Sequence, residues 1–142
     1  ELILEKQAGE VPVIEDERIQ EINFGELEGV ICFNDAHEYL NPEMEKFFTD
    51  PWNFKRPKNG ENISDILTRT RDFWKEKIHD PSLEDKTILI ASLGCAVRAI
   101  LQNVYQDPQN FWHGCVPPNC SVNVVEVTDG RAVFLEEDKV YA

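Results

Sequence analysis

The chain has few basic residues and no long apolar run. Lysine and arginine together number 14 against 27 aspartates and glutamates, which gives a formal net charge of −13. This charge argues against nucleic acid and anionic membrane surfaces as partners, because both are polyanions. The longest apolar stretches, such as residues 88–91, are far shorter than the ~20 residues that span a bilayer. The start of the sequence shows no secretion signal, so we expect a cytoplasmic protein without a membrane segment.

Cysteine and histidine are also scarce, with four and three residues. A domain of this length does not need disulfides for stability, so we expect Cys32, Cys95, Cys115 and Cys120 to be thiols. His113, Cys115 and Cys120 offer three metal ligands, but no fourth is evident and the spacing matches no zinc signature. We therefore expect neither a metal nor another cofactor.

The composition is that of one globular domain. Of the 142 residues, 42% are apolar and 10% aromatic, which is enough for a packed core. No internal repeat, low-complexity tract or shift in composition marks a linker. We expect residues 1–142 to form a single domain.

The first half of the chain alternates short elements with turns. Residues 1–7 have helical spacing but no capping residue before them, so we expect the sequence to begin inside a helix that Gly9 ends. A short β-like run follows at 12–14, and then a loop over 21–29 with sharp turns at its glycines. Apolar residues at helical intervals predict two short helices within 33–48, interrupted by a proline.

The second half has stronger patterns. Residues 50–62 are rich in proline and asparagine and predict an irregular surface segment. A helix is predicted over 63–78, with Asn62 or Ser64 as its cap. Residues 87–92 are apolar and rich in β-branched side chains, which is typical of a strand buried on both faces of a parallel sheet, with helices covering both sides.

A glycine turn and a helix over 95–105 follow this strand. Strands at 120–127 and 131–137, joined by residues 128–130, predict a hairpin. The strand–turn–helix unit places the backbone N–H groups of Gly94 and Cys95 at the positive end of a helix dipole. Such a point can bind phosphate, although most turns of this kind bind nothing.

The same turn allows other interpretations. A thiol phosphatase needs an arginine six residues after its cysteine, whereas Arg98 follows Cys95 by three. Ser92 resembles the nucleophile of a G-x-S-x-G elbow, with Asp107 and His113 in the order of a serine hydrolase, but the first glycine is missing. Cys95 can be a thiol of lowered pKa at a helix start, or simply a small core residue.

Three carboxylates surround the turn at Gly25, namely Glu21, Glu26 and Glu28. One of them, held near a phosphate, could protonate a leaving oxygen as a general acid. Acidic loops are more often simply solvated, and the sequence alone leaves both interpretations open.

Four segments in order resemble the histidine phosphatase family, the phosphoglycerate mutase-like superfamily. They are the loop 20–30, the Gly-Glu-Asn at 60–62, the strand, turn and helix of 88–101, and the closing strand 119–127. The resemblance spans nearly the whole chain. It implies an α/β three-layer sandwich with a mostly parallel central sheet flanked by helices. It also implies a phosphomonoesterase that transfers the phosphoryl group through a phosphohistidine.

The resemblance also assigns residues. The family motif E-x-x-F-G-x-x-E-G carries the general acid on its first glutamate, which matches Glu21, while Glu28 and Gly29 complete the motif as structural residues. The second histidine of the family, in a Ser-His-Gly turn, helps to hold the phosphoryl oxygens. Here Leu93 stands in its place, and this side chain can neither donate a hydrogen bond nor carry a charge.

The Arg-His-Gly that supplies the family's nucleophile has no counterpart, and none of His37, His79 and His113 matches it. We therefore expect the first strand and helix of the family to be absent, so that the strand at 87–92 lacks a neighbour and exposes apolar surface. Another polypeptide, a swapped segment or a rearrangement is expected to fill this edge, as in a homo-oligomer or a swapped dimer.

These observations predict a phosphatase of a small phosphorylated metabolite as the intact parent, and an inactive, truncated or degenerate form in these 142 residues. The alternative is a binding or regulatory pseudoenzyme that captures a phosphorylated ligand without hydrolysing it. A third hypothesis is a metal-dependent or serine hydrolase at the elbow-like turn. A mutase is less expected, because Arg18 is the only arginine near Glu21 in the sequence for a second phosphate.

Overall fold

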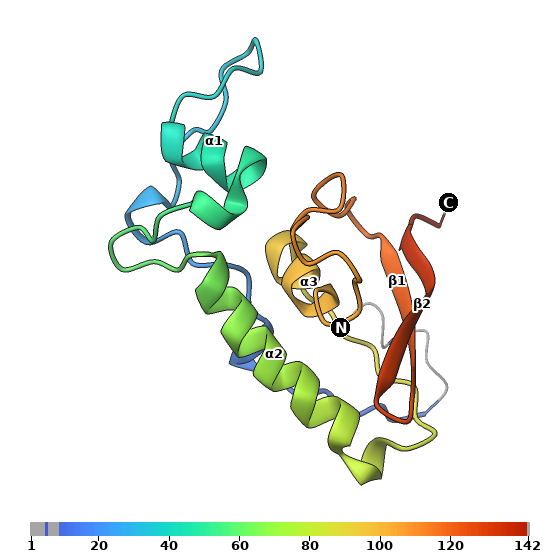
Figure 1. Ribbon diagram of the computed structural model, residues 1–142. Coiled ribbons are helices and arrows are strands. Elements are labelled where there is room, and N and C mark those ends of the chain that lie inside the picture. The colour runs from blue at the N-terminus through green and yellow to red at the C-terminus, as the bar shows by residue number, and fades with distance from the viewer. Residues whose placement is uncertain (1–4, 6–8, 142) are drawn as a thin grey trace.

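The computed structural model describes residues 5 and 9–141. Within them the chain forms an α/β arrangement of three α-helices and one two-stranded antiparallel sheet. The elements are α1 (Pro42–Thr49), α2 (Ile63–His79), α3 (Gly94–Leu101), β1 (Val122–Thr128) and β2 (Arg131–Lys139). Figure 1 shows α3 between the long helix α2 and the hairpin, with α1 beyond one end of α2.

Helix α2 confirms the predicted helix. Its side chains Ile63, Ile66, Thr70 and Phe73 are buried and form one stripe. Asn62 is the N-cap, and its side chain accepts a hydrogen bond from the N–H of Asp65 while the Asp65 side chain accepts one from the N–H of Asn62. This reciprocal pair is a capping box, which fixes where the helix begins.

The prediction of two helices within 33–48 is only half right. Pro42 begins α1 instead of separating two helices, because a proline is tolerated in the first helical turn, where its missing N–H costs nothing. The residues before it form a small loop closed by an isolated bridge between Phe33 and Tyr39. The Asn34 side chain accepts hydrogen bonds from the N–H groups of Ala36 and Glu38, which stabilises a turn in place of a helix.

The hairpin is confirmed. Strands β1 and β2 pair antiparallel with Thr128 opposite Arg131, so the connecting loop has two residues. Asp129 and Gly130 both have positive φ, at 52° and 74°, as a type I′ turn requires.

The predicted buried strand at 87–92 is absent. Residues 86–93 belong to no helix or strand, and among the described residues no backbone hydrogen bond reaches 87–92. Ile88 and Leu89 are exposed, at 45% and 67%. The physical reason is that a strand needs a neighbour to pair with, and β1 and β2 pair only with each other. The short β-like run at 12–14 likewise forms no strand.

Part of one prediction lies outside the described residues. The helix expected over 1–7 falls almost entirely there, whereas Gly9 is described and has a φ of +108°. The segment 50–62 is irregular as predicted, apart from a 3-10 turn at Pro51–Asn53, but it does not lie wholly at the surface, because Pro51, Phe54 and Pro57 are buried. The helix predicted over 95–105 is shorter, since α3 ends at Leu101.

The core joins the helices to the site loops. It contains Ile22 from the loop after residue 20, residues of all three helices, and two aromatic residues from the loop 102–121 between α3 and β1, here called the late loop. The members are Ile22, Met44, Phe47, Phe54, Ile63, Ile66, Cys95, Ala96, Ala99, Phe111 and Trp112. The indole N–H of Trp112 donates to the carbonyl oxygen of Phe47 at 2.9 Å, which ties the late loop to α1.

A buried arginine anchors α3 to the hairpin. The Arg98 side chain is fully buried and pairs with Asp138 at the end of β2. It also donates to the Cys115 carbonyl at 2.9 Å and to the Tyr105 hydroxyl at 2.6 Å. These bonds satisfy a charge that would otherwise be costly to bury, so α3 has a fixed place against the sheet.

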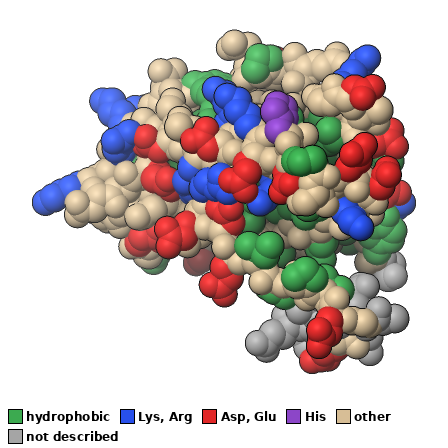
Figure 2. Space-filling model, turned by 90° about the horizontal axis from the view of Figure 1, so that it is seen from below, with side chains coloured by type: hydrophobic (Ala, Val, Ile, Leu, Met, Phe, Trp, Pro, Cys, Tyr) green, Lys and Arg blue, Asp and Glu red, His purple; other side chains and the backbone are tan. Residues whose placement is uncertain are grey.

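No helix among the described residues has the length and apolar character that a bilayer crossing requires. The face shown in Figure 2 carries acidic and basic side chains interspersed with apolar ones.

The capping box gives a stability prediction. Asn62→Ala should lower the free energy of unfolding by ~1 kcal/mol, because it removes a side-chain acceptor at the start of α2. Ser64→Ala serves as the control, since the Ser64 side chain is exposed and caps nothing. Urea denaturation of both variants tests this, and equal losses would contradict the role of Asn62.

Candidate active site

Helix α3 begins at Gly94 without a cap of its own. The N-cap residue is Leu93, whose extended backbone allows the helix to start but whose side chain makes no capping hydrogen bond. The first N–H groups of a helix need partners from outside it. The partners at α3 must therefore come from another segment.

Glu21 supplies that cap from far away in the sequence. Its Oε2 accepts the N–H of Cys95 and its Oε1 accepts the N–H of Ala96, both at 3.0 Å. Oε1 also accepts the N–H of Ile22 at 2.7 Å. The negative carboxylate thus lies at the positive end of the helix dipole, a favourable arrangement. The structure brings together Glu21, Gly94 and Cys95, the residues singled out from the sequence.

Gly94 keeps this junction open. A Cβ atom at this position would lie 3.0 Å from Cγ1 of Val116 and 3.7 Å from Oε2 of Glu21. The N–H of Gly94 itself makes no hydrogen bond within the described part of the chain. One donor at the start of α3 is therefore available next to the carboxylate.

The loop that carries Glu21 is shaped by its glycines. Gly25 has a φ of +54°, and a Cβ there would lie 2.3 Å from the carbonyl oxygen of Lys58. A Cβ at Gly60 would lie 2.8 Å from the carbonyl oxygen of Asn23. The two loops touch through bare backbone, which only glycine permits.

Glu28 has a structural role in this loop. Its Oε1 accepts the N–H of Phe24 at 2.8 Å, and its own N–H donates to the carbonyl oxygen of Gly25. Glu26 is also exposed, but unlike Glu28 its carboxylate makes no hydrogen bond to the described residues. Of the three carboxylates, only Glu21 faces α3.

Sequence reasoning missed two residues that hold this loop. Arg69, on α2, donates to the backbone carbonyls of residues 18, 20 and 21 and pairs with Glu61 at 2.8 Å. The Gly-Glu-Asn before a helix could have marked Glu61, but no motif marks Arg69. The two residues line a cavity of about 440 Å3 together with Glu17, Arg18, Gln20, Glu21 and Asn23.

Cys95 is not a reactive thiolate. Its side chain is buried in the core, and burial, followed by the charge of Glu21, raises the pKa of the thiol above its ordinary value. Only its backbone N–H takes part in the site. All four cysteines are described, and each is a free thiol, as predicted.

Leu93 and the three histidines add no imidazole to this site. Leu93 is 65% exposed at the position that the resemblance gives to a histidine. His37 and His79 are exposed, and His113 stacks on Tyr105 with ring centroids 3.4 Å apart. Burial and the nearby Arg98 charge lower the pKa of His113. Within the described residues no cluster of histidine, cysteine and carboxylate side chains could hold a metal ion.

The elbow interpretation finds no support in the contacts of its residues. The Ser92 hydroxyl donates to the carbonyl oxygen of Ile19 at 2.7 Å. Asp107 accepts the N–H of Gln109, and His113 lies on Tyr105. No two of Ser92, Asp107 and His113 share a hydrogen bond in the described structure.

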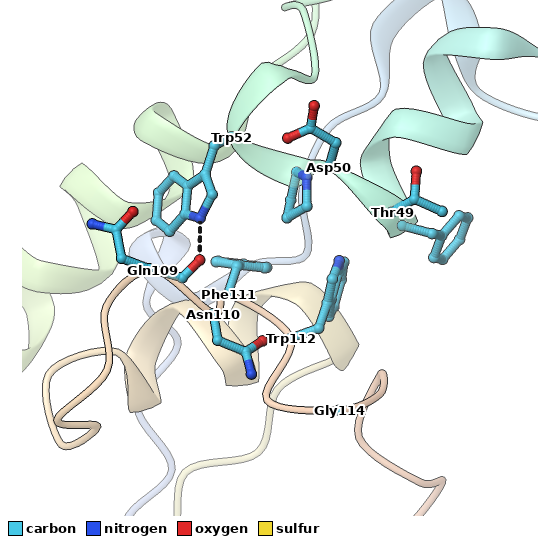
Figure 3. A pocket seen from close by; sticks show the side chains of 10 residues that line it. Thr49, Asp50, Trp52, Gln109, Asn110, Phe111, Trp112 and Gly114 are labelled. Atoms are coloured by element: carbon cyan, nitrogen blue, oxygen red, sulfur yellow. Dashed lines mark hydrogen bonds between the residues drawn. The ribbon is translucent and has the colours of Figure 1, made fainter.

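A second cavity, of about 400 Å3, lies between the 48–52 segment and the late loop. Figure 3 shows its lining, in which the indole N–H of Trp52 donates to the carbonyl oxygen of Gln109 at 2.7 Å. Trp52 also packs edge-on against Phe111, with ring centroids 5.9 Å apart. The cavity shares no lining residue with the one beside Glu21.

Comparison with known proteins gives the family. A model of the histidine phosphatase superfamily, branch 1, matches residues 1–138. A 2,3-bisphosphoglycerate-dependent phosphoglycerate mutase 2 of Gloeobacter violaceus is 34% identical over 96 residues, which are 67% of this chain and 42% of that protein.

A 2,3-bisphosphoglycerate-dependent phosphoglycerate mutase of Cytophaga hutchinsonii is 26% identical over 117 residues, 79% of this chain and 52% of that protein. The chain thus spans about half the length of the curated relatives it matches. No solved structure matches it at a significant level. The family match over nearly the whole sequence agrees with the four motifs, and the chain belongs to the histidine phosphatase superfamily.

Proposed function

We propose that this chain carries the phosphate-binding part of a phosphatase site that acts on a small phosphorylated metabolite. The observation that carries the proposal is the contact of Glu21 with the N-terminus of α3, at 3.0 Å from two N–H groups. A family acid and a helix start that can bind an anion meet there, although 74 residues separate Glu21 from Cys95.

The proposed chemistry follows from these atoms. A phosphate group competes with Glu21 for the N–H groups of Cys95 and Ala96 and gains the open N–H of Gly94. Once displaced, the Glu21 carboxyl group stays beside the ester and, when protonated, can give its proton to the departing oxygen. The amides stabilise the charge on the phosphoryl oxygens.

The nucleophile is the missing part. The family resemblance implies transfer to a histidine in an Arg-His-Gly segment, which residues 1–142 do not contain. Leu93 also removes the second imidazole. We therefore propose that this chain by itself binds the ester without turning it over, which is also what a regulatory pseudoenzyme would do.

The local charges favour a monophosphate over a bisphosphate. The two relatives are bisphosphoglycerate-dependent mutases by their names. Here Arg18 pairs with Asp16 and Glu76, and Arg69 pairs with Glu61. Both arginines that line the cavity beside Glu21 are thus engaged, so neither offers a free charge for a second phosphate.

Phosphate binding to the isolated chain tests the site. Glu21→Gln should bind inorganic phosphate about tenfold more tightly than the wild type, because a competing charged hydrogen-bond acceptor is removed. The control is Glu26→Gln, which makes the same change of net charge on the same exposed loop. Isothermal titration calorimetry measures both, and equal affinities of the two variants would refute the proposed competition.

The absence of a nucleophile gives a separate prediction. The chain should hydrolyse p-nitrophenyl phosphate no faster than a buffer blank, because no imidazole accepts the phosphoryl group. Release of p-nitrophenolate is followed by its absorbance. Turnover above the buffer blank would contradict the prediction, and a triple variant of His37, His79 and His113 would then show whether one of these imidazoles is the nucleophile.

We further propose that residues 87–92 form a strand when a second chain supplies the neighbour. The unpaired backbone groups of this segment and its exposed apolar side chains support the proposal. The same edge on a second copy offers matching donors and acceptors, and a twofold axis pairs the two segments antiparallel, so a homodimer satisfies both.

Oligomeric state tests this edge. The chain should be a dimer by light scattering at about 0.15 M salt, where screening reduces the repulsion between two acidic copies. Leu89→Lys should shift it to a monomer, whereas Leu135→Lys, on an exposed position of β2, should not. A wild-type chain that is monomeric at all concentrations would refute the proposed dimer.

A further inference from the structure

One arginine of α2 fixes the backbone segment that carries Glu21. The Arg69 side chain, 19% exposed, lies against residues 18–21. Its Nη1 donates to the carbonyl oxygens of Arg18, at 2.8 Å, and Gln20, at 2.7 Å. Its Nη2 donates to the carbonyl oxygen of Glu21 at 3.1 Å. One planar, rigid group thus holds three carbonyls within four residues.

The other donors of Arg69 bind Glu61. Nε donates to Oε1 at 2.8 Å and Nη2 donates to Oε2 at 2.9 Å. Together with the three carbonyls, these two bonds use all five N–H donors of the guanidinium group. Arg69 therefore has no donor left for a ligand.

Glu61 holds the far side of the same segment. Its Oε2 accepts the N–H of Asn23 at 3.0 Å, and its own N–H donates to the carbonyl oxygen of Asn23 at 2.8 Å. Burial opposes the charge on Glu61, but the bonds from Arg69 and Asn23 outweigh it and lower the pKa of this carboxyl group. Glu61 is consequently ionised near neutral pH and keeps its pairing with Arg69.

Arg69 and Glu61 together form a clamp that holds the backbone on both sides of the Glu21 side chain. Residues 21–24 belong to no helix or strand, so no regular hydrogen bonding sets their path. The fixed carbonyls of residues 18 and 20 precede the Cα atom of Glu21, and the fixed carbonyl of Glu21 itself and the fixed N–H of Asn23 follow it. Catalytic groups tolerate displacements of only about 1 Å before activity falls steeply.

We propose that Arg69 and Glu61 are positioning residues that hold Glu21 at the start of α3. Neither residue touches the ligand, and both act through the place they give to the Glu21 carboxylate. The inference deepens the proposed function and rests on it for its catalytic meaning, because Glu21 is the proposed acid.

Hydrogen exchange tests the clamp without any ligand. In Arg69→Met the N–H groups of Cys95 and Ala96 should exchange about tenfold faster by NMR, as expected for the loss of a hydrogen bond to a charged acceptor. The N–H groups of Ile100 and Leu101, at the other end of α3, serve as the internal reference and should change little. Arg71→Met is the matched control, since Arg71 is exposed on the same helix and forms no ion pair with the described residues.

A double-mutant cycle shows whether Arg69 acts through Glu21. Glu21→Ala alone should expose the same two N–H groups, and adding Arg69→Met to it should change their exchange no further. If Arg69→Met does not fold, Glu61→Gln gives the same comparison, because it keeps the shape of the side chain and removes the charge that holds Arg69.

The outcomes separate positioning from general stability. Faster exchange confined to Cys95 and Ala96, and absent in the Glu21→Ala background, supports the proposal. A uniform rise across α2 and α3, or an effect that persists without Glu21, overturns it. A parallel calorimetric titration with inorganic phosphate keeps the two proposals apart, since a clamp that works in a chain without phosphate affinity refutes only the proposed function.

Discussion

The contact between the Glu21 carboxylate and the first N–H groups of α3 is the interaction on which the site depends. Helix α3 has no cap from its own neighbours, because Leu93 has no polar group to offer. Glu21 satisfies two of its donors and in return is held by them. One interaction therefore stabilises a helix end and places an acid, so the stability of the fold and the geometry of the site are coupled.

Two arginines keep the Glu21 segment and the N-terminus of α3 in place relative to each other. Arg98, fully buried, binds α3 to the end of β2 and to the late loop. Arg69 binds the Glu21 segment to α2, which packs against α3. Each of these two arginines is matched by a carboxylate and by backbone carbonyl oxygen, which satisfies its charge where it is removed from solvent.

Local patterns were enough to predict part of the fold. Asn62 and the stripe of α2 predicted that helix, and Asp129-Gly130 predicted the hairpin, because both signals act within a few residues. The prediction of a strand at 87–92 was wrong, because the pattern indicates that these residues favour a sheet but not whether a neighbouring strand is present. Pro42 was misjudged because a proline can end one helix or begin another.

The candidate site was predicted only in part, because motifs identify residues but not the tertiary contacts between them. Glu21, Gly94 and Cys95 follow from motifs, and the structure places them together. Which atoms meet could not be predicted, because the bond between Glu21 and Ala96 depends on tertiary packing across 75 residues. Arg69 was invisible for a related reason, as a helical arginine is usually solvated and only its contacts reveal otherwise.

The bare-backbone contact between Gly25 and Gly60 has a consequence for how this protein can diverge. Because no side chain cushions the contact, an insertion near residue 58 would displace the turn at Gly25 and, through it, the acid four residues earlier. Changes of loop length are tolerated further away, at residues 35–38, which are exposed and contribute nothing to the buried core. Natural variants of this protein should accordingly differ in length at residues 35–38 and keep a constant length near residue 58.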